Sequence, residues 1–357
     1  MKKTLATILF PSLLTAIPMS TMAKDFSLGQ GWTADISIQV QAFFVDNDSS
    51  VKTENDSGIS SGFDPSKLTV SVTAPKQNGY VVSGTIQATQ NNNGPNSAED
   101  NDIDGQLDSF VNNNDEFRIA EFSVSGDFGT VKAGRSWQIM GSSSLSHDTG
   151  SSPGVGGQCV SVGSSLGDFG GGCGRIGYGY VWTYFAVGFQ YGSPNYNGFS
   201  YNIGVFDSPS DNPRIEGDIN YNSPLFDIWA SFSEDEDSTG ADISAVDVGF
   251  EIRISDFALT AAYTDSTGIT NGLRGTNPGV DSEYFYVEAD YTLGATTFGV
   301  SYGENEVDGN SDSSDLTMAF IHHKLTDAIT LVAEFNTEDI ANGGSTDRLV
   351  FGGQLNF

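Results

Sequence analysis

The end of the chain alternates strictly between apolar and polar side chains. Residues 345–357 read STDRLVFGGQLNF, and in an extended strand successive side chains point to opposite faces. One face would carry Leu349, Phe351, Gly353, Leu355 and the terminal Phe357, and the other Arg348, Gln354 and Asn356. Such a strand is typical of a membrane-spanning β-barrel, in which lipid-facing and lumen-facing residues alternate. An edge strand of a soluble β domain is the alternative.

Similar amphipathic segments recur along the chain, about sixteen in all, each near the 9–11 residues of a tilted transmembrane strand. The first sets Ala34, Ile36, Ile38, Val40, Ala42 and Phe44 against Asp35, Ser37, Gln39 and Gln41. A later one sets Val246, Val248, Phe250, Ile252 and Ile254 against Asp247, Glu251 and Arg253. Because this period of two is the pattern of strands, the sequence predicts an all-β fold.

The connections between these segments alternate between short and long. The short links are 75–79, 126–128, 193–198, 223–225, 255–256, 293–294 and 326–327. The longer polar connections are 46–66, 90–114, 138–179, 234–243, 266–281, 304–313 and 338–346. Short periplasmic turns opposite longer external loops are typical of bacterial outer-membrane barrels, and a soluble sandwich has no reason to sort its loops in this way.

The first 23 residues predict an export signal. Lys2 and Lys3 precede an apolar run from Leu5 to Met19, and Thr21, Met22 and Ala23 supply small residues for cleavage. The mature barrel would then comprise residues 24–357. No later segment approaches the roughly 20 consecutive apolar residues of a spanning helix.

The chain is strongly acidic. Its formal charge is −31, from 46 acidic and 15 basic residues, and loss of Lys2 and Lys3 with the signal would leave 13 basic residues. This charge argues against nucleic acid as a partner and would raise the local concentration of cations in an aqueous channel. The alternative for most of these carboxylates is that they keep long loops solvated.

Two segments resemble general porins of Gram-negative bacteria. Residues 126–135, GDFGTVKAGR, resemble the fourth-to-fifth strand region of that family, and residues 191–200, YGSPNYNGFS, are similar to a turn two strands later. The resemblance implies a 16-stranded antiparallel transmembrane β-barrel in the outer membrane. It also implies a homotrimer, and a long third external loop that folds inward and narrows the pore.

The third loop would be residues 138–179, the longest connection, with a Gly-rich core over residues 150–177. It carries both cysteines of the chain, Cys159 and Cys173. Because export leads to an oxidising compartment, we expect a disulfide between them. Closing a loop of about 15 residues would contribute roughly 3 kcal/mol on the chain-entropy model. Two free thiols or a metal pair are the alternatives.

The resemblance also implies a pore constriction with arginines on the wall opposite carboxylates of the loop. Arg135 closes the first matching motif and is the wall position it assigns, with Arg118 and Arg175 as companions. Asp148 and Asp168 are the loop carboxylates. Opposed charges would orient water and dipolar solutes in the lumen. The alternative for each is an ordinary charge of the lumen or rim.

One acidic segment partly matches a calcium loop. Asp100, Asp102 and Asp104 precede Gly105 with the spacing that begins an EF-hand, but the twelfth position is Val111, where such a loop needs a bidentate Glu. The sequence therefore predicts weak Ca²⁺ binding, or none. Residues 234–237 are interpreted as a solvated loop tip or as a contact to divalent cations that bridge lipopolysaccharide.

We therefore predict a passive diffusion channel for ions and small hydrophilic solutes, with a preference for cations and no enzymatic step or cofactor. The histidines are His147, His322 and His323, and no nucleophile elbow is present. One alternative is a substrate-selective porin with Trp182, Tyr184 and Trp229 lining the lumen. The other is a structural or adhesive barrel with a plugged lumen.

Overall fold

The computed structural model describes residues 24–50, 57–60, 62–90, 117–157, 173–208, 210, 212–270, 272, 277–341 and 343–357. Within these ranges the chain forms eighteen strands of one sheet and one short helix, α1 (Ser142–Ser146). No helix of the described residues is long and apolar enough to cross a membrane.

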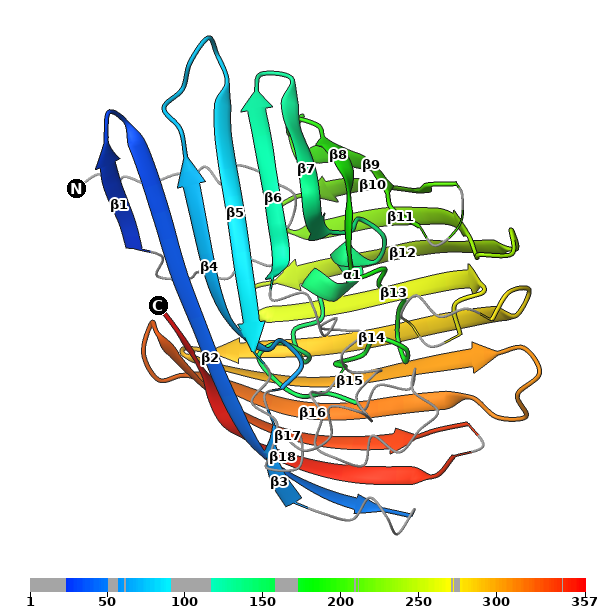
Figure 1. Ribbon diagram of the computed structural model, residues 1–357. Coiled ribbons are helices and arrows are strands. Elements are labelled where there is room, and N and C mark those ends of the chain that lie inside the picture. The colour runs from blue at the N-terminus through cyan, green and yellow to red at the C-terminus, as the bar shows by residue number, and fades with distance from the viewer. Residues whose placement is uncertain are drawn as a thin grey trace.

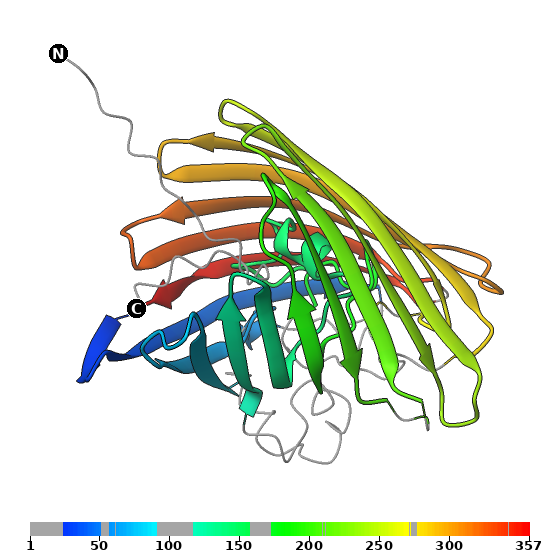
Figure 2. The ribbon, with the colours of Figure 1, turned by 90° about the horizontal axis from the view of Figure 1, so that it is seen from above.

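Sixteen of these strands pair antiparallel with their neighbours in a closed ring (Figures 1 and 2). They are β2 (Trp32–Ser49), β4 (Ser66–Thr73), β5 (Val81–Gln90), β6 (Phe117–Gly126), β7 (Gly129–Trp137), β8 (Phe185–Gly192), β9 (Phe199–Phe206), β10 (Arg214–Asn222), β11 (Phe226–Glu236), β12 (Asp242–Ile254), β13 (Phe257–Thr267), β14 (Asp281–Leu293), β15 (Thr296–Val307), β16 (Ser314–Lys324), β17 (Ile329–Asp339) and β18 (Ser345–Asn356). The predicted 16-stranded barrel is confirmed.

The last strand closes the ring on the long strand β2. β18 pairs with β2 so that Val350 lies opposite Val45 and Phe351 opposite Phe44. On its other side β2 pairs with β4 over Thr33–Gln39 and with the short strand β3 (Ser57–Ser60) over Phe43–Asp46. The remaining strand, β1 (Lys24–Gly29), folds back on the start of β2. Closure leaves no open edge in the ring of sixteen described strands, as a wall in lipid requires.

The two faces of the wall differ in polarity as the sequence predicts. On β18, Leu349 and Phe351 are exposed on the outside, as is Phe357 just after the strand, whereas Arg348 and Gln354 are buried. On β12, Val246, Val248, Phe250, Ile252 and Ile254 are exposed, and Asp247 is fully buried. A continuous apolar exterior with polar residues behind it is the arrangement that a bilayer stabilises.

The short links lie where they are predicted. Each of them joins two neighbouring strands of the ring: β4 to β5, β6 to β7, β8 to β9, β10 to β11, β12 to β13, β14 to β15 and β16 to β17. The longest described connection runs from the end of β7 to the start of β8, across residues 138–184. It contains α1, which Figure 2 shows between the wall formed by β14–β17 and the wall formed by β6–β8.

Candidate functional site

The connection between β7 and β8, described over residues 138–157 and 173–184, is held by side chains of distant strands; we call it the β7–β8 segment. Its first contact is with Glu216 of β10, whose carboxylate accepts the backbone N–H groups of Ile139 at 2.8 Å and Met140 at 3.0 Å. Arg214 lies 2.8 Å from the same carboxylate. The segment is therefore bonded to the wall as soon as it leaves β7.

The helix α1 is bonded to β10, β11 and β12. Ser144 donates to Asp247 of β12 at 2.8 Å and accepts the indole N–H of Trp229 of β11 at 2.9 Å. Ser143 donates to Asn220 of β10 at 2.9 Å. Gly141, just before α1, has a positive φ of 73°, and a Cβ there would lie 1.9 Å from the carbonyl oxygen of Val181. Only glycine allows this close approach of the two arms of the segment.

A buried ion network fixes the middle of the segment. Arg175 lies between Asp148 of the segment and Glu288 of β14, and its Nη2 is 2.5 Å from the Glu288 carboxylate. All three side chains are fully buried. Glu288 also accepts the N–H of Thr149 at 2.8 Å, and Asp148 accepts the Tyr180 hydroxyl at 2.8 Å. Burial disfavours a charged guanidinium, but Asp148 and then Glu288 outweigh it and raise the pKa of Arg175 above its ordinary value.

The same pattern repeats on β17. Glu334 accepts the N–H groups of Val155 at 3.0 Å and Gly156 at 3.2 Å. Glu338 accepts the hydroxyl of Tyr178. Arg348 of β18 donates to the carbonyl oxygen of Gly156 at 2.7 Å. The segment thus contacts β10, β11, β12, β14, β17 and β18.

Five wall carboxylates share one role. Each accepts hydrogen bonds from the β7–β8 segment, and each is at most 2% exposed: Glu216, Asp247, Glu288, Glu334 and Glu338. Sequence reasoning missed these residues because it treated the acidic residues as a collective charge of the channel or as solvation of long loops. For Glu216, Asp247, Glu288 and Glu334 the available signal was a carboxylate on the polar face of a strand, whereas Glu338 lies at the end of β17, in the predicted connection 338–346.

Arg118 is half-buried on β6 and belongs to a group of charges that includes Asp64 and Lys67. It lies 3.7 Å from Asp64, which also pairs with Lys67 of β4 at 2.6 Å. Its guanidinium lies 5.1 Å from the centre of the Phe185 ring. The pairing of β5 with β6 shifts register between Gln87 and Ala88, at the height of Arg118. Without a bulge, two successive residues of a strand point to opposite faces. Here the bulge allows Arg118 to lie beside Asp64 while the next residue, Ile119, is buried in the core cluster.

Arg135 lies on β7 opposite Ala120 of β6 and Val187 of β8, and is half-buried. Arg135 and Arg118 both act on the hydroxyl of Tyr184. Burial raises the pKa of this hydroxyl, and the positive charges of the two arginines lower it. The structure therefore brings Arg118 and Arg135 together near Tyr184.

Arg175 and Asp148 differ from the predicted arrangement, in which wall arginines face loop carboxylates across the lumen. Both belong to the β7–β8 segment and pair directly with each other, and neither is exposed. Here the wall supplies the carboxylate, Glu288, and the segment supplies the cation. These two residues hold the segment in place rather than presenting charge to water.

Several predicted residues lie outside the described ranges. They are Asp168, Cys159, the calcium candidates Asp100, Asp102 and Asp104, and the export signal of residues 1–23. Cys173 is described and is 2% exposed. The Cys159–Cys173 bridge and the calcium site therefore stay predictions.

The candidate aromatic residues form one cluster that is largely closed to the lumen. Trp182 and Trp229 are 4% and 2% exposed, and Tyr184 packs against the same cluster. The rings of Trp182 and Tyr184 are 5.2 Å apart. Gly249 makes room for Trp229, because a Cβ there would lie 2.2 Å from the indole ring. These aromatics pack the segment against the wall instead of offering open faces to a solute.

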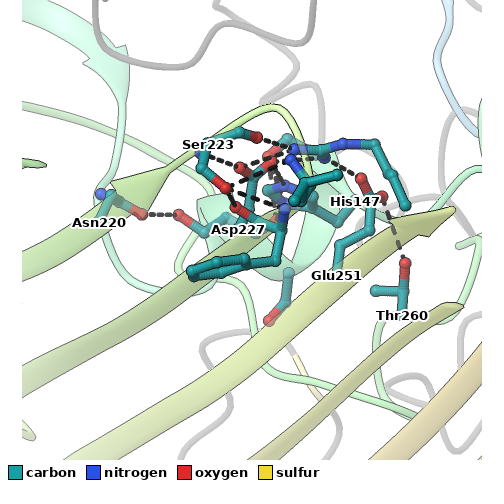
Figure 3. A network of polar contacts seen from close by, with 12 residues as sticks. His147, Asn220, Ser223, Asp227, Glu251 and Thr260 are labelled. Carbon is teal, nitrogen blue, oxygen red and sulfur yellow. Dashed lines mark hydrogen bonds and ion pairs between the residues drawn. The ribbon is translucent and has the colours of Figure 1, made fainter. Parts of the chain in front are cut away.

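A second polar network lies at the end of α1, near the short link that joins β10 to β11 (Figure 3). His147, at the end of α1, is 3.2 Å from Asp227 of β11, and its ring stacks on Trp229 with centroids 4.3 Å apart. Arg253 of β12 bridges the carboxylates of Asp227 and Glu251. Sequence reasoning did not connect these residues, because they come from three separate elements.

Comparisons with known proteins agree with this architecture. The family model of the Gram-negative porins matches residues 12–342. No curated protein sequence matches the chain. The structure is similar to the anion-selective porin from Comamonas acidovorans, with a TM-score of 0.68 and 14% identity over 91% of this chain and 100% of that one.

Two further structures share the fold. OmpF of Salmonella typhi, in complex with daunomycin, has a TM-score of 0.65 and 13% identity over 94% of this chain and 100% of that one. The trimer form of OmpT, an outer membrane protein of Vibrio cholerae, has a TM-score of 0.59 and 16% identity over 92% of this chain and 100% of that one. By its family match and its closed 16-stranded barrel, the chain belongs to the Gram-negative porins, the channel proteins of the outer membrane.

Proposed function

We propose that the protein is a passive diffusion channel for ions and small hydrophilic solutes, with a preference for cations, and that it catalyses no reaction. The observation that carries this proposal is the β7–β8 segment, which is bonded to the polar side of the wall through five buried carboxylates. A segment held in this way would narrow the lumen to a fixed width, so that solutes are selected by size without a chemical step.

Charge supports the preference for cations, although the Comamonas acidovorans porin with the same fold is anion-selective. The chain carries 46 acidic and 15 basic residues. The basic side chains Lys67, Arg118, Lys132 and Arg135 gather on β4, β6 and β7. Asp64 lies beside Lys67 and Arg118, and Glu121 lies 3.1 Å from Lys132. The net field of the channel is therefore negative, with a local basic patch on one wall.

Removing one charge of this patch tests the electrostatic part of the proposal. Arg118→Gln is expected to shift the reversal potential toward stronger cation preference in a potassium chloride gradient, because a lumen cation is lost while Asp64 stays. The shift should shrink at high salt, where screening shortens the reach of the charge to about 3 Å. Lys324→Gln is the control, because it removes the same charge from the exposed end of β16. An equal shift in both variants, or none in Arg118→Gln, would contradict the assignment.

We also propose that a Cys159–Cys173 disulfide stiffens the segment. The oxidising compartment of an outer-membrane protein favours the bridge. Reduction, or the Cys159→Ser variant, is expected to increase open-channel current noise because the Gly-rich connection between the cysteines gains freedom. Free-thiol labelling before and after reductant measures the bridge itself. Full labelling of the unreduced protein would rule out the bridge.

The assembly we propose is a homotrimer embedded in outer-membrane lipid and lipopolysaccharide. The trimer form of OmpT shows that a barrel of this fold can assemble in this way. The apolar exterior supplies the surface that lipid or a second copy would cover. External acidic loops would contact divalent cations that bridge lipopolysaccharide.

A flux experiment separates the open channel from a plugged barrel. Proteoliposomes that contain the refolded protein are placed in isotonic solutions of uncharged sugars of increasing size, and swelling is followed by light scattering. Fast swelling with small sugars that falls steeply with size supports the diffusion channel. No swelling with the smallest sugar, despite verified insertion, would support a structural or adhesive barrel instead. Swelling with one sugar far above others of its size would support substrate selectivity.

A further inference from the structure

The network around His147 contains a set of potential metal ligands. One ring nitrogen of His147 and one carboxylate oxygen each of Asp227 and Glu251 lie within 4.8 Å of one another. These residues come from the end of α1, from β11 and from β12, so that an ion bound to all three would join the β7–β8 segment to two strands of the wall. Figure 3 shows the three side chains converging.

Hydrogen bonding fixes which nitrogen of His147 faces the carboxylates. Nδ1 lies 2.8 Å from the backbone carbonyl oxygen of Ser143. Because a carbonyl oxygen only accepts, the Nδ1 proton is donated to it. Nε2 then faces Asp227 Oδ2 at 3.2 Å, where either a proton on Nε2 or a bound cation can join the two atoms. A histidine whose other ring N–H is bonded to a backbone carbonyl is the usual form of a metal ligand.

The carboxylates are oriented by neighbours in the same way. Asp227 Oδ1 accepts the backbone N–H of Ser223 at 3.2 Å, and the second oxygen of Glu251 accepts the Thr260 hydroxyl at 3.3 Å. Metal–ligand bonds in zinc sites are about 2.0–2.2 Å long, which is compatible with the 3.2 Å between Nε2 and Asp227 Oδ2. The side chains of His147, Asp227 and Glu251 are 15%, 11% and 12% exposed, so each keeps some contact with solvent.

We propose that His147, Asp227 and Glu251 form a binding site for a divalent transition-metal ion of the zinc type, with water completing its coordination. Nitrogen and carboxylate ligands with an open position are typical of such ions. Arg253 Nη1 now lies between the two carboxylates, 2.7 Å from Asp227, and the ion displaces it. Nη2 of Arg253 donates to Asp227 Oδ1 at 2.9 Å and to the carbonyl oxygen of Ser223 at 2.6 Å, and these bonds oppose the displacement.

Because Arg253 competes with the ion, two variants should change zinc affinity in opposite directions. The experiment is calorimetric titration of the refolded, untagged protein with zinc chloride at constant pH. His147→Ala is expected to weaken zinc affinity about tenfold or more. Mutation of a residue that only orients a metal ligand already costs about this much affinity, and loss of the ligand itself should cost at least as much. Arg253→Gln is expected to strengthen binding, because the competing cation is removed. His323→Ala, which changes a histidine on β16, is the matched control and should bind as the unaltered protein does.

Each outcome decides the proposal. Zinc binding that is lost in His147→Ala, kept in His323→Ala and strengthened in Arg253→Gln supports it. Absence of zinc binding, or equal binding in the unaltered protein and His147→Ala, overturns it. Folding of every variant is checked by the compact, heat-sensitive migration of the barrel on gels, so that a misfolded variant is not counted. Conductance during the same titration gives a second readout, with block expected only where the site is intact.

Discussion

Replacing Arg175 with methionine is expected to release the β7–β8 segment from the wall while leaving the barrel closed. Arg175 is the cation between the buried carboxylates of Asp148 and Glu288. Removing one partner of such a network leaves uncompensated buried charge and costs about 3–5 kcal/mol. The cost falls on the segment, because the strands are held by their own ladders. Single-channel recordings should show a larger and noisier conductance, and limited proteolysis should cut the segment faster.

Two further variants give this prediction its controls. Lys324→Met removes one positive charge from the exposed end of β16 and should change neither conductance nor cleavage. Combining Arg175→Met with Asp148→Asn and Glu288→Gln removes the buried negative charges as well, and should recover part of the protection. Unchanged conductance and protease resistance in Arg175→Met alone would mean that the ion network does not hold the segment.

A positive charge on the outer face should destabilise the barrel far more than the same charge one residue away on the inner face. Ile203 of β9 is 48% exposed on the apolar exterior, whereas its neighbour Asn202 donates to Asp218 at 2.7 Å. Ile203→Arg is expected to cost about 2–4 kcal/mol if it lies near the bilayer midplane. Asn202→Arg should cost much less, because the new guanidinium lies beside the Asp218 carboxylate.

The measurement is denaturant unfolding of both variants in lipid vesicles, followed by tryptophan fluorescence. Comparing adjacent residues on one strand removes differences in strand pairing and depth. Equal losses of stability would mean that the two faces see the same environment. A larger loss for Asn202→Arg would reverse the assignment of inside and outside.

The barrel could be predicted because most strands have one face in lipid and the other in polar surroundings. On β18 and β12 the sequence alternates between apolar and polar residues in the same way as the exposed and buried faces do, and the short links mark where strands turn. β16 is an exception, because it carries apolar residues on both faces. Leu316, Met318 and Phe320 are buried on the inner face, and Ala319 and Ile321 lie on the outer face. Leu316 and Met318 pack against Tyr178 of the β7–β8 segment. A strand that is apolar on both faces carries no signal for its orientation.

The contacts of the segment could not be predicted for a different reason. Each joins residues far apart in sequence, such as Arg175 with Glu288 or Val155 with Glu334, and no local pattern encodes such a pairing. The place of Arg118 depends on one register shift between β5 and β6, which strict alternation does not contain. Prediction from composition treated carboxylates as a collective charge, whereas the structure uses five of them as individual acceptors.

The central claim is that the barrel is an open, ion-conducting channel narrowed by the β7–β8 segment. The most direct test is single-channel recording of the purified, refolded protein in a planar bilayer under a potassium chloride gradient. The proposal predicts large ohmic steps, in groups of three if the trimer forms, with a reversal potential of the sign that cation preference gives. A silent bilayer despite verified insertion would contradict it, and a reversal potential of the opposite sign would contradict the selectivity.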